Sequence, residues 1–275
     1  MIDNFKDKIC VVTGAGSGIG RAVALNLAKK GATLALSDIN SETLEETLAL
    51  IGKDRTNRIM IDRLDVSDAT AIETYATRVK ESLGPADYLF NIAGLSRVGA
   101  FKETPLSSFE KVINVNFWGV VRMTKAFLPQ LIQKKGGVIN ISSIFGFIGV
   151  AGQAHYCASK FGVRGFSEAL GAELAADGVR VTSVHPGGIA TNIARAAEVD
   201  ALPAGVSKAD LAARFDNVAI TSADKAAEII VNGAAKGARR VLIGADAHLV
   251  SIVQRLLPAR YPRILALLGR RPVSR

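Results

Sequence analysis

Histidine, cysteine and tryptophan are scarce in this 275-residue chain, which has three, two and one of them. Two cysteines cannot form a disulfide framework, and such rarity is typical of a protein from a reducing compartment. So few histidines and cysteines, with no cluster at ligand spacing, argue against a metal site. The N-terminal residues show no basic and then apolar leader, so we expect a cytoplasmic protein.

Acidic residues are absent after Asp246, where six arginines supply most of the net charge of +9. Aromatic residues make up only 6% of the chain, and the body has no basic patch interleaved with aromatics. Nucleic acid is therefore not an expected partner. The uncharged run 136–159 contains several glycines and serines together with Asn140, Gln153 and His155, which excludes a membrane-spanning helix.

Short apolar segments alternate with amphipathic ones along the whole chain. We expect helices beginning at Ile19, Ser41, Ser67 and Pro105, the last running on to Gln133. The expected strands are residues 8–13, 33–37, 59–64, 88–92, 138–141, 179–184 and 240–243. This alternation predicts one α/β domain, a Rossmann-type doubly wound fold with a mostly parallel seven-stranded sheet and helices on both faces.

The catalytic domain is expected to occupy residues 1–246, with a substrate loop at about 187–221. Residues 247–275 form a basic, apolar C-terminal extension. Composition marks no linker, and we find no internal repeat. One large core with a short tail is the organisation that the sequence predicts.

Tyr156 and Lys160 are four residues apart on an expected helix, so their side chains share one face. A neighbouring ammonium favours the phenolate form of a tyrosine. A tyrosine in that position can exchange a proton with an alcohol or ketone oxygen. Ser143, just past the end of a strand, could donate a hydrogen bond to the same oxygen.

Gly14, Gly18 and Gly20 follow the first strand and open a helix, where a pyrophosphate can approach the backbone. Their spacing is G-x-x-x-G-x-G rather than G-x-G-x-x-G. Ligands of doubly wound sheets bind beyond the carboxyl ends of the strands. The unusual residues of this chain fall at those ends: 14–20, Asp38, Asp65, 91–94, Ser143 and 186–188.

Several of these motifs together resemble the short-chain dehydrogenase/reductase family in order and spacing, over roughly residues 5–245. They are TGAGSGIG at 13–20, NIAG at 91–94, Asn116, Ser143, YCASK at 156–160 and Pro186-Gly187. Ile92 departs from the pattern, because the family usually has a second asparagine there. The resemblance implies an NAD-dependent alcohol dehydrogenase or carbonyl reductase.

The same resemblance implies a catalytic tetrad. Tyr156 would be the acid/base, and Lys160 would lower its pKa and bind the nicotinamide ribose. Ser143 would orient the substrate oxygen, and Asn116 would hold a water that links Lys160 to solvent.

Asp38 ends the second strand, where a carboxylate binds an adenosine ribose and repels a 2′-phosphate. Neither the two residues that follow Asp38 nor Ser17 is basic, so we predict NAD as cofactor rather than NADP. The resemblance implies a cofactor site made of Gly14, Ser17, Gly18, Ile19, Gly20, Asp38, Asp65, Val66, Asn91, Ala93, Gly94, Tyr156, Lys160, Pro186, Gly187, Ile189 and Thr191.

Apolar residues surround the expected substrate side, which predicts a hydrophobic secondary alcohol or ketone as substrate. They are Leu95, Val98, Phe145, Phe147, Ile148, Ile189, Ile193 and the alanine-rich segment to Phe215. The alternative hypothesis is a non-catalytic dinucleotide-binding sensor or scaffold of the same fold. We expect a homodimer or homotetramer. The tail either lies on anionic lipid as a peripheral membrane contact or packs over the substrate cleft or a neighbouring subunit.

Overall fold

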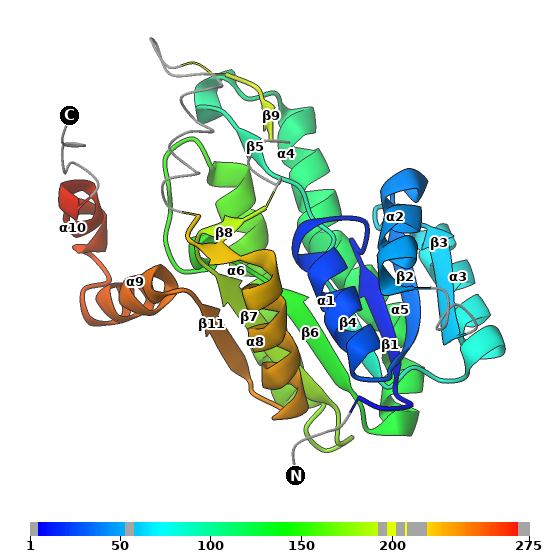
Figure 1. Ribbon diagram of the computed structural model, residues 1–275. Helices are drawn as coiled ribbons and strands as arrows, with labels where there is room; N and C mark the ends of the chain where they lie inside the picture. The colour runs from blue at the N-terminus through cyan, green and yellow to red at the C-terminus, as the bar shows by residue number, and fades with distance from the viewer. Residues whose placement is uncertain (1–4, 53–57, 192–196, 202–206, 208–218, 269–275) are drawn as a thin grey trace.

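Seven parallel strands form one central sheet in the order β11-β7-β6-β4-β1-β2-β3, with helices on both faces (Figure 1). The computed structural model describes residues 5–52, 58–191, 197–201, 207 and 219–268. The strands of the sheet are β1 Ile9–Thr13, β2 Thr33–Asp38, β3 Ile59–Arg63, β4 Tyr88–Asn91, β6 Gly137–Ile141, β7 Arg180–Pro186 and β11 Arg240–Ile243. The predicted doubly wound, seven-stranded fold is confirmed.

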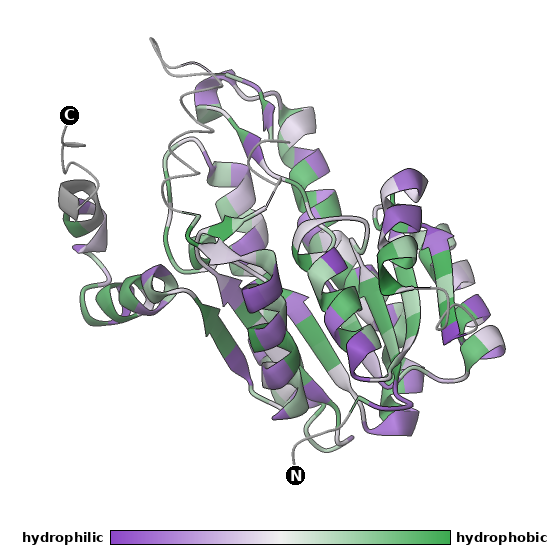
Figure 2. Ribbon diagram, viewed as in Figure 1, coloured by the Kyte–Doolittle hydropathy of each residue, from purple (hydrophilic) through white to green (hydrophobic). Residues whose placement is uncertain are grey.

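Two apolar clusters, one on each face, hold the helices to the sheet. Side chains alternate along a strand, so Cys10 and Val12 of β1 belong to one cluster and Ile9 and Val11 to the other. Green strands flanked by helices that are green on one side and purple on the other show this pattern in Figure 2. The described helices are α1 Gly18–Lys29, α2 Ser41–Ile51, α3 Ala69–Leu83, α4 Leu106–Ile113, α5 Gly119–Lys134, α6 Ala154–Glu173, α8 Ala223–Ala235, α9 Ala245–Leu256 and α10 Tyr261–Leu268.

The helix predicted from Pro105 to Gln133 is interrupted. Its middle, Asn114–Trp118, is a π-helical turn between α4 and α5. α2 begins at Ser41 as predicted, but Asn40 rather than the serine is its cap, and α3 begins at Ala69, two residues after the predicted Ser67, with Asp68 as its cap. Asn40, which precedes Ser41, and Asp68, which follows Ser67, each accept a first-turn N–H with a side-chain oxygen. The expected serines do not.

The loop predicted at 187–221 contains three short strands among its described residues. They are β8 Ile189–Ala190, β9 Glu198–Val199 and β10 Thr221–Ser222. β10 pairs with β8, and β9 pairs with β5, Arg97–Val98, from the loop after β4. Two further segments beside the site form single 3-10 turns, Phe101–Glu103 and Ile144–Gly146.

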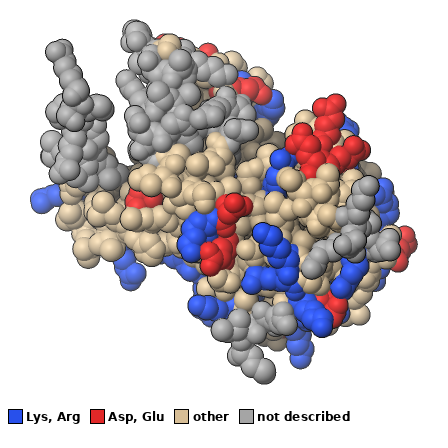
Figure 3. Space-filling model, viewed as in Figure 1, with Lys and Arg blue, Asp and Glu red and all other residues tan. Residues whose placement is uncertain are grey.

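The C-terminal extension forms α9 and α10, seen in orange and red at one end of the sheet in Figure 1. α9 begins at Ala245, so this helix crosses the domain boundary expected at residue 246. On the face shown in Figure 3, basic and acidic side chains lie side by side over the body. Among the described residues, no helix is long and apolar enough to cross a membrane.

Candidate active site

The turn between β1 and α1 lies against the end of β4, at the point where the strand order reverses. Gly14 has a φ of +67°, and a Cβ there would lie 2.9 Å from the backbone of Ala93. Both facts require glycine at this position. Thr13 Oγ1 accepts the N–H groups of Ile92 and Ala93 at 3.0 and 3.1 Å. The carboxyl ends of β1 and β4 are therefore locked together.

The N-terminus of α1 meets the conditions for binding an anion. Ser17 is its N-cap residue and makes no side-chain cap hydrogen bond. First-turn N–H groups of a helix have no intrahelical partner and suit a phosphate. A Cβ at Gly18, whose φ is +50°, would lie 3.3 Å from Thr191 Cγ2, which brings Thr191 to the same turn. The turn can therefore cradle a pyrophosphate between α1 and β8.

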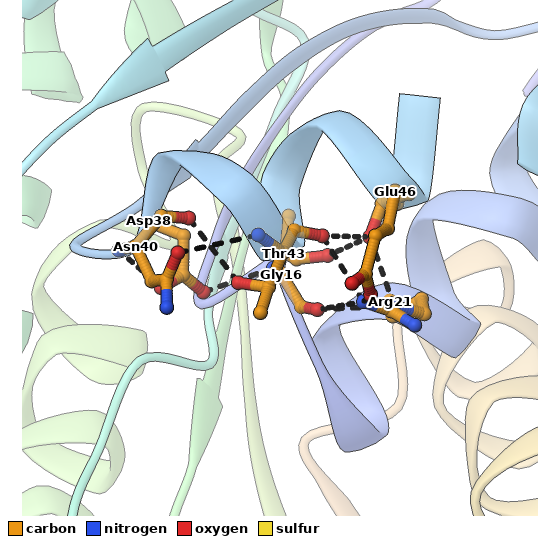
Figure 4. A network of polar contacts seen from close by, with 8 residues as sticks. Gly16, Arg21, Asp38, Asn40, Thr43 and Glu46 are labelled. Atoms are coloured by element: carbon orange, nitrogen blue, oxygen red, sulfur yellow. Dashed lines mark hydrogen bonds and ion pairs between the residues drawn. The ribbon is translucent and has the colours of Figure 1, made fainter. Parts of the chain in front are cut away.

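Asp38 at the end of β2 holds the far side of this turn (Figure 4). Its carboxylate accepts the N–H of Gly16 at 2.9 Å and the N–H of Asn40 at 3.0 Å. Arg21 is a residue that sequence reasoning missed, although it directly follows Gly20. Its guanidinium donates to the carbonyls of Gly16 and Thr43 and pairs with Glu46 at 2.7 Å. The arginine thus stabilises the turn and faces carbonyls and Glu46.

Asp65 and Val66, also expected at the cofactor, follow β3. Asp65 Oδ1 accepts the N–H of Ser67 at 2.8 Å, and Val66 is buried against Gly119. Asn91 has a different setting, because its side chain is buried and donates to Thr124 and Asn140. The Asn91 amide therefore braces the strands and α5 from inside the protein.

Ser143, Tyr156 and Lys160 meet where β6 ends and α6 begins. Burial raises the pKa of Tyr156 to about 12, and a hydrogen bond with Ser143 opposes that rise. Burial lowers the pKa of Lys160 to about 8. The Lys160 ammonium donates to the carbonyl of Ile141 at 2.9 Å and lies 5.6 Å from the centroid of the Tyr156 ring. Burial therefore dominates the pKa of Tyr156, which the sequence predicted that Lys160 would lower.

Asn116 reaches this group from the π-helical turn. Its Oδ1 accepts the N–H of Leu95 at 2.8 Å, and its Nδ2 donates to the Leu95 carbonyl at 2.9 Å and to Ser159 Oγ at 3.3 Å. A Cβ at Gly94 would lie 3.2 Å from Asn116 Oδ1 and 3.6 Å from Lys160 Nζ. Such turns are frequent at functional sites, and this one brings Asn116 to Gly94, beside Lys160.

Three further residues hold the site together, and none was expected to do so. Ser142 is buried and donates to the Lys160 carbonyl at 2.8 Å. His185 contacts the Ser143 carbonyl at 3.2 Å, and burial lowers its pKa to about 3, so its ring is neutral. Asp246 accepts the N–H of Gly188 at 2.7 Å. A polar residue inside a buried strand was the available signal for His185, and an acid in a first helical turn for Asp246.

Fewer apolar residues line the substrate side of the site than the sequence predicts. Phe147 and Ile148 are buried in a cluster with Val250, so they do not line a pocket. Ile189 is buried as well, and Ile193 and most of the segment to Phe215 lie outside the described residues. Leu95, Val98 and Phe145 remain half-buried there. The ring of Phe145 meets that of Tyr156 edge-on at 6.1 Å.

Residues 8–201 match the family model of the short-chain dehydrogenases. The chain belongs to this family. An oxidoreductase of Mycobacterium tuberculosis named SadH is 44% identical over 269 residues, which cover 96% of each chain. The meso-2,3-butanediol dehydrogenase of Serratia marcescens is 36% identical over 69% of this chain and 74% of its own.

Among solved structures, a short-chain dehydrogenase/reductase from Burkholderia phymatum in complex with NAD superimposes with a TM-score of 0.81. It is 25% identical over 99% of each chain. The chain is therefore a short-chain dehydrogenase by sequence and by fold, and its class is oxidoreductase. Within the part of the chain that the structure describes, no three metal-ligating side chains gather into a site.

Proposed function

We propose that this short-chain dehydrogenase transfers a hydride between NAD(H) and a hydrophobic secondary alcohol or ketone. The observation that carries the proposal is the meeting of Ser143, Tyr156, Lys160 and Asn116 at the sheet edge, beside the glycine turn. NAD supplies the hydride chemistry when it is bound. The chain supplies the cradle, the orientation of the substrate oxygen and the proton.

The proton step follows from the pKa values of the two buried groups. A Tyr156 pKa of about 12 keeps the phenol protonated at neutral pH, so its hydroxyl can donate to a ketone oxygen. Ser143 hydrogen-bonds Tyr156 and can orient the same oxygen. Lys160, held by Ile141, presents its positive charge beside the ring. In this form the site is set for ketone reduction, and alcohol oxidation requires the phenol to lose its proton first.

The nature of the turn supports NAD rather than NADP. The Asp38 carboxylate lies where an adenosine ribose is bound in doubly wound folds, and it would repel a 2′-phosphate. Arg21 is near this position but is engaged with Gly16, Thr43 and Glu46. The cradle fits a dinucleotide, because Gly14 and Gly18 leave room where a Cβ would close on Ala93 and Thr191.

The substrate side supports an apolar secondary alcohol. Its half-buried side chains are Leu95, Val98 and Phe145, with the Phe145 ring directly against Tyr156. The butanediol dehydrogenase relative is named for a secondary alcohol. We expect steroid-like, aryl or long-chain alcohols to react more efficiently than ethanol or sugars.

The alternative is a dinucleotide-binding sensor that keeps the fold without turnover. Cofactor fluorescence with a panel of alcohols and ketones separates the two, because a sensor would bind NADH and reduce none of the ketones. The geometry favours the enzyme, since a sensor has no use for a phenol, a hydroxyl and an ammonium gathered at one point.

Tyr156→Phe tests the proposal most directly. The variant keeps the ring and loses only the hydroxyl, so NADH binding should persist while kcat falls by about 10²–10⁴-fold. Tyr75→Phe, in the core beside α5, is the matched control and should retain its activity. A Tyr156→Phe enzyme with more than about a tenth of wild-type kcat would show that another group moves the proton.

We also propose that the protein self-associates and is cytoplasmic. Trp118 and Phe161 are 47% and 40% exposed near the π-helical turn, and such aromatic rings suit a self-association face in a homodimer or homotetramer. Both cysteines are unpaired and buried, which supports a cytoplasmic location.

The tail packs on the body through Tyr261, whose hydroxyl accepts the N–H of Gly149 at 3.0 Å. We take this contact to support the tail as a cover of the substrate side. Peripheral contact with anionic lipid is the second candidate, because Leu249, Ile252 and Leu256 are exposed on α9.

A further inference from the structure

A cluster of charged side chains on the substrate side has no part in the proton and hydride chemistry. β5 and β9 pair in parallel, Arg97 beside Glu198 and Val98 beside Val199. The Asp200 N–H donates to the Val98 carbonyl at 2.9 Å. Arg97 also donates twice to the Asp200 carboxylate, from Nε at 3.1 Å and from Nη2 at 2.5 Å. A two-bond pair of this kind fixes orientation as well as distance.

The inner ion pair of this cluster is buried, and an outer one is exposed. The side chain of Asp200 is 4% exposed and that of Arg97 is 12% exposed. Ser108 of α4 donates a further hydrogen bond to Asp200 at 2.8 Å. These bonds, led by the one from Arg97, lower the pKa of Asp200. Glu198, in contrast, is half exposed and pairs with the exposed Lys111 at 3.0 Å.

His155 connects the buried pair to the catalytic tyrosine. Its Nδ1 accepts the N–H of Tyr156 at 2.9 Å, so in the neutral ring the proton is on Nε2. That Nε2 is 4.0 Å from Asp200 Oδ2 and has no hydrogen-bond partner among the described residues. Burial lowers the pKa of His155, which favours this neutral form. The ring also packs against Phe109 of α4, so three elements meet at His155.

We propose that Arg97 and Asp200 are positioning residues for substrate recognition. Their ion pair fixes residues 198–201 against β5 and the first turn of α6, beside Val98 and one residue from Tyr156. The cofactor turn lies on other elements and shares no side chain with this cluster. Breaking the pair should therefore weaken substrate binding and leave NADH binding unchanged.

The energetics of a buried ion pair predict how the single and double variants should differ. Arg97→Met leaves the buried Asp200 carboxylate without its ion-pair partner, and Asp200→Asn leaves Arg97 paired only with the half-exposed Glu198, whereas the double variant removes both buried charges. Arg97→Met and Asp200→Asn should each perturb the site more than the Arg97→Met/Asp200→Asn double variant. Lys111→Met, which removes only the exposed partner of Glu198, is the matched control.

The first measurement is ketone reduction with NADH, and it rests on the proposed function. For 4-phenyl-2-butanone, KM should rise about tenfold in each single variant, with kcat lowered less than KM is raised. The dissociation constant of NADH, measured by fluorescence, should stay within about twofold of wild type. The KM of the double variant should lie between that of the wild type and those of the single variants. Lys111→Met should behave as wild type.

The second measurement does not depend on turnover. Hydrogen–deuterium exchange measures the Asp200 N–H, which donates to the Val98 carbonyl at 2.9 Å. Without the ion pair this N–H should exchange about tenfold faster, with the amides of α5 unchanged as the control for global unfolding.

The outcomes separate this proposal from the proposed function. Unchanged exchange of the Asp200 N–H in Arg97→Met, or an NADH affinity that falls together with substrate affinity, would overturn the positioning role. A wild-type protein that reduces no ketone would overturn the proposed function instead, while the exchange result would still decide whether the pair holds residues 198–201.

Discussion

Tyr156 and Lys160 have pKa shifts in opposite directions with one cause. Burial disfavours the charged form of each group, so it raises the pKa of the phenol to about 12 and lowers that of the ammonium to about 8. At neutral pH the phenol is therefore uncharged and the ammonium still carries its proton. Burying that ammonium at the catalytic site lowers the stability of the folded protein.

Lys160→Met should stabilise the protein at pH 7. An unfolded lysine has a pKa near 10.5, so below pH 8 both states are protonated and the full burial cost applies. That cost is about 3 kcal/mol, and loss of the hydrogen bond to Ile141 offsets it by about 1 kcal/mol. Between pH 8 and 10.5 the folded state loses its proton first, so the cost shrinks and the advantage of methionine should shrink with it.

Denaturant unfolding of wild type and Lys160→Met at pH 7 and pH 9.5 measures both effects. Lys125→Met, at an exposed position on α5, is the control. A stability difference between Lys160→Met and wild type that is the same at both pH values would mean that Lys160 titrates as a solvated lysine.

Asp38→Asn should narrow the preference for NADH over NADPH. The substitution keeps an acceptor oxygen for the N–H of Gly16, replaces the oxygen that accepts the N–H of Asn40 by an NH2 group, and removes the charge that would repel a 2′-phosphate. We expect the ratio of kcat/KM values for the two cofactors to fall at least about tenfold, or 1.4 kcal/mol. Glu42→Gln, an exposed carboxylate of α2, is the control. A wild-type enzyme that uses NADPH more efficiently would contradict this role of Asp38.

At the scale of elements, the sequence was informative wherever local pattern decides structure. Apolar alternation located all seven strands of the sheet, and helical spacing placed Tyr156 above Lys160. The π-helical turn that carries Asn116 could not be predicted, because the Asn116 amide is positioned by a hydrogen bond with Leu95, which is far away in the sequence. The bracing roles of Asn91 and His185 likewise depend on strands that pair only in the folded chain.

The turn after β7 gives an element-scale prediction. Asp246, in the first turn of α9, accepts the buried N–H of Gly188, and its carboxylate closes on Gly187. Asp246→Ala would leave that N–H without its partner, at a cost of about 1–3 kcal/mol, and should weaken NADH binding by loosening the turn before Thr191. Asp224→Asn, an exposed first-turn acid of α8, is the control for the helix dipole alone.

Thermal unfolding and NADH fluorescence measure the two effects of Asp246→Ala. Equal losses of stability in Asp246→Ala and Asp224→Asn would mean that Asp246 acts only as a charge at the end of a helix.

At the scale of the whole molecule, the tail is joined to the body through Val250 and Tyr261 and exposes an apolar stripe. Tyr261 binds the loop after Ser143 through Gly149, while Leu249, Ile252 and Leu256 remain exposed along α9. The exposed Arg255, Arg260 and Arg263 accompany the stripe. Apolar side chains flanked by arginines suit an anionic lipid surface, whereas the Tyr261 contact suits a cover over the substrate side.

Deletion after Asp246 distinguishes these two roles of the tail. If the tail is a cover, the truncated protein should lose affinity for a large apolar ketone, and co-sedimentation with phosphatidylserine vesicles should be as weak as in the full chain. Leu256→Asp in the full chain is the matched variant, because it changes an exposed position of α9 and leaves Tyr261 in place. It should reduce vesicle binding if the stripe is an anchor and leave ketone reduction unchanged in either case. Loss of vesicle binding in both variants, with turnover of a soluble ketone preserved, would contradict the cover and assign the tail to the membrane surface.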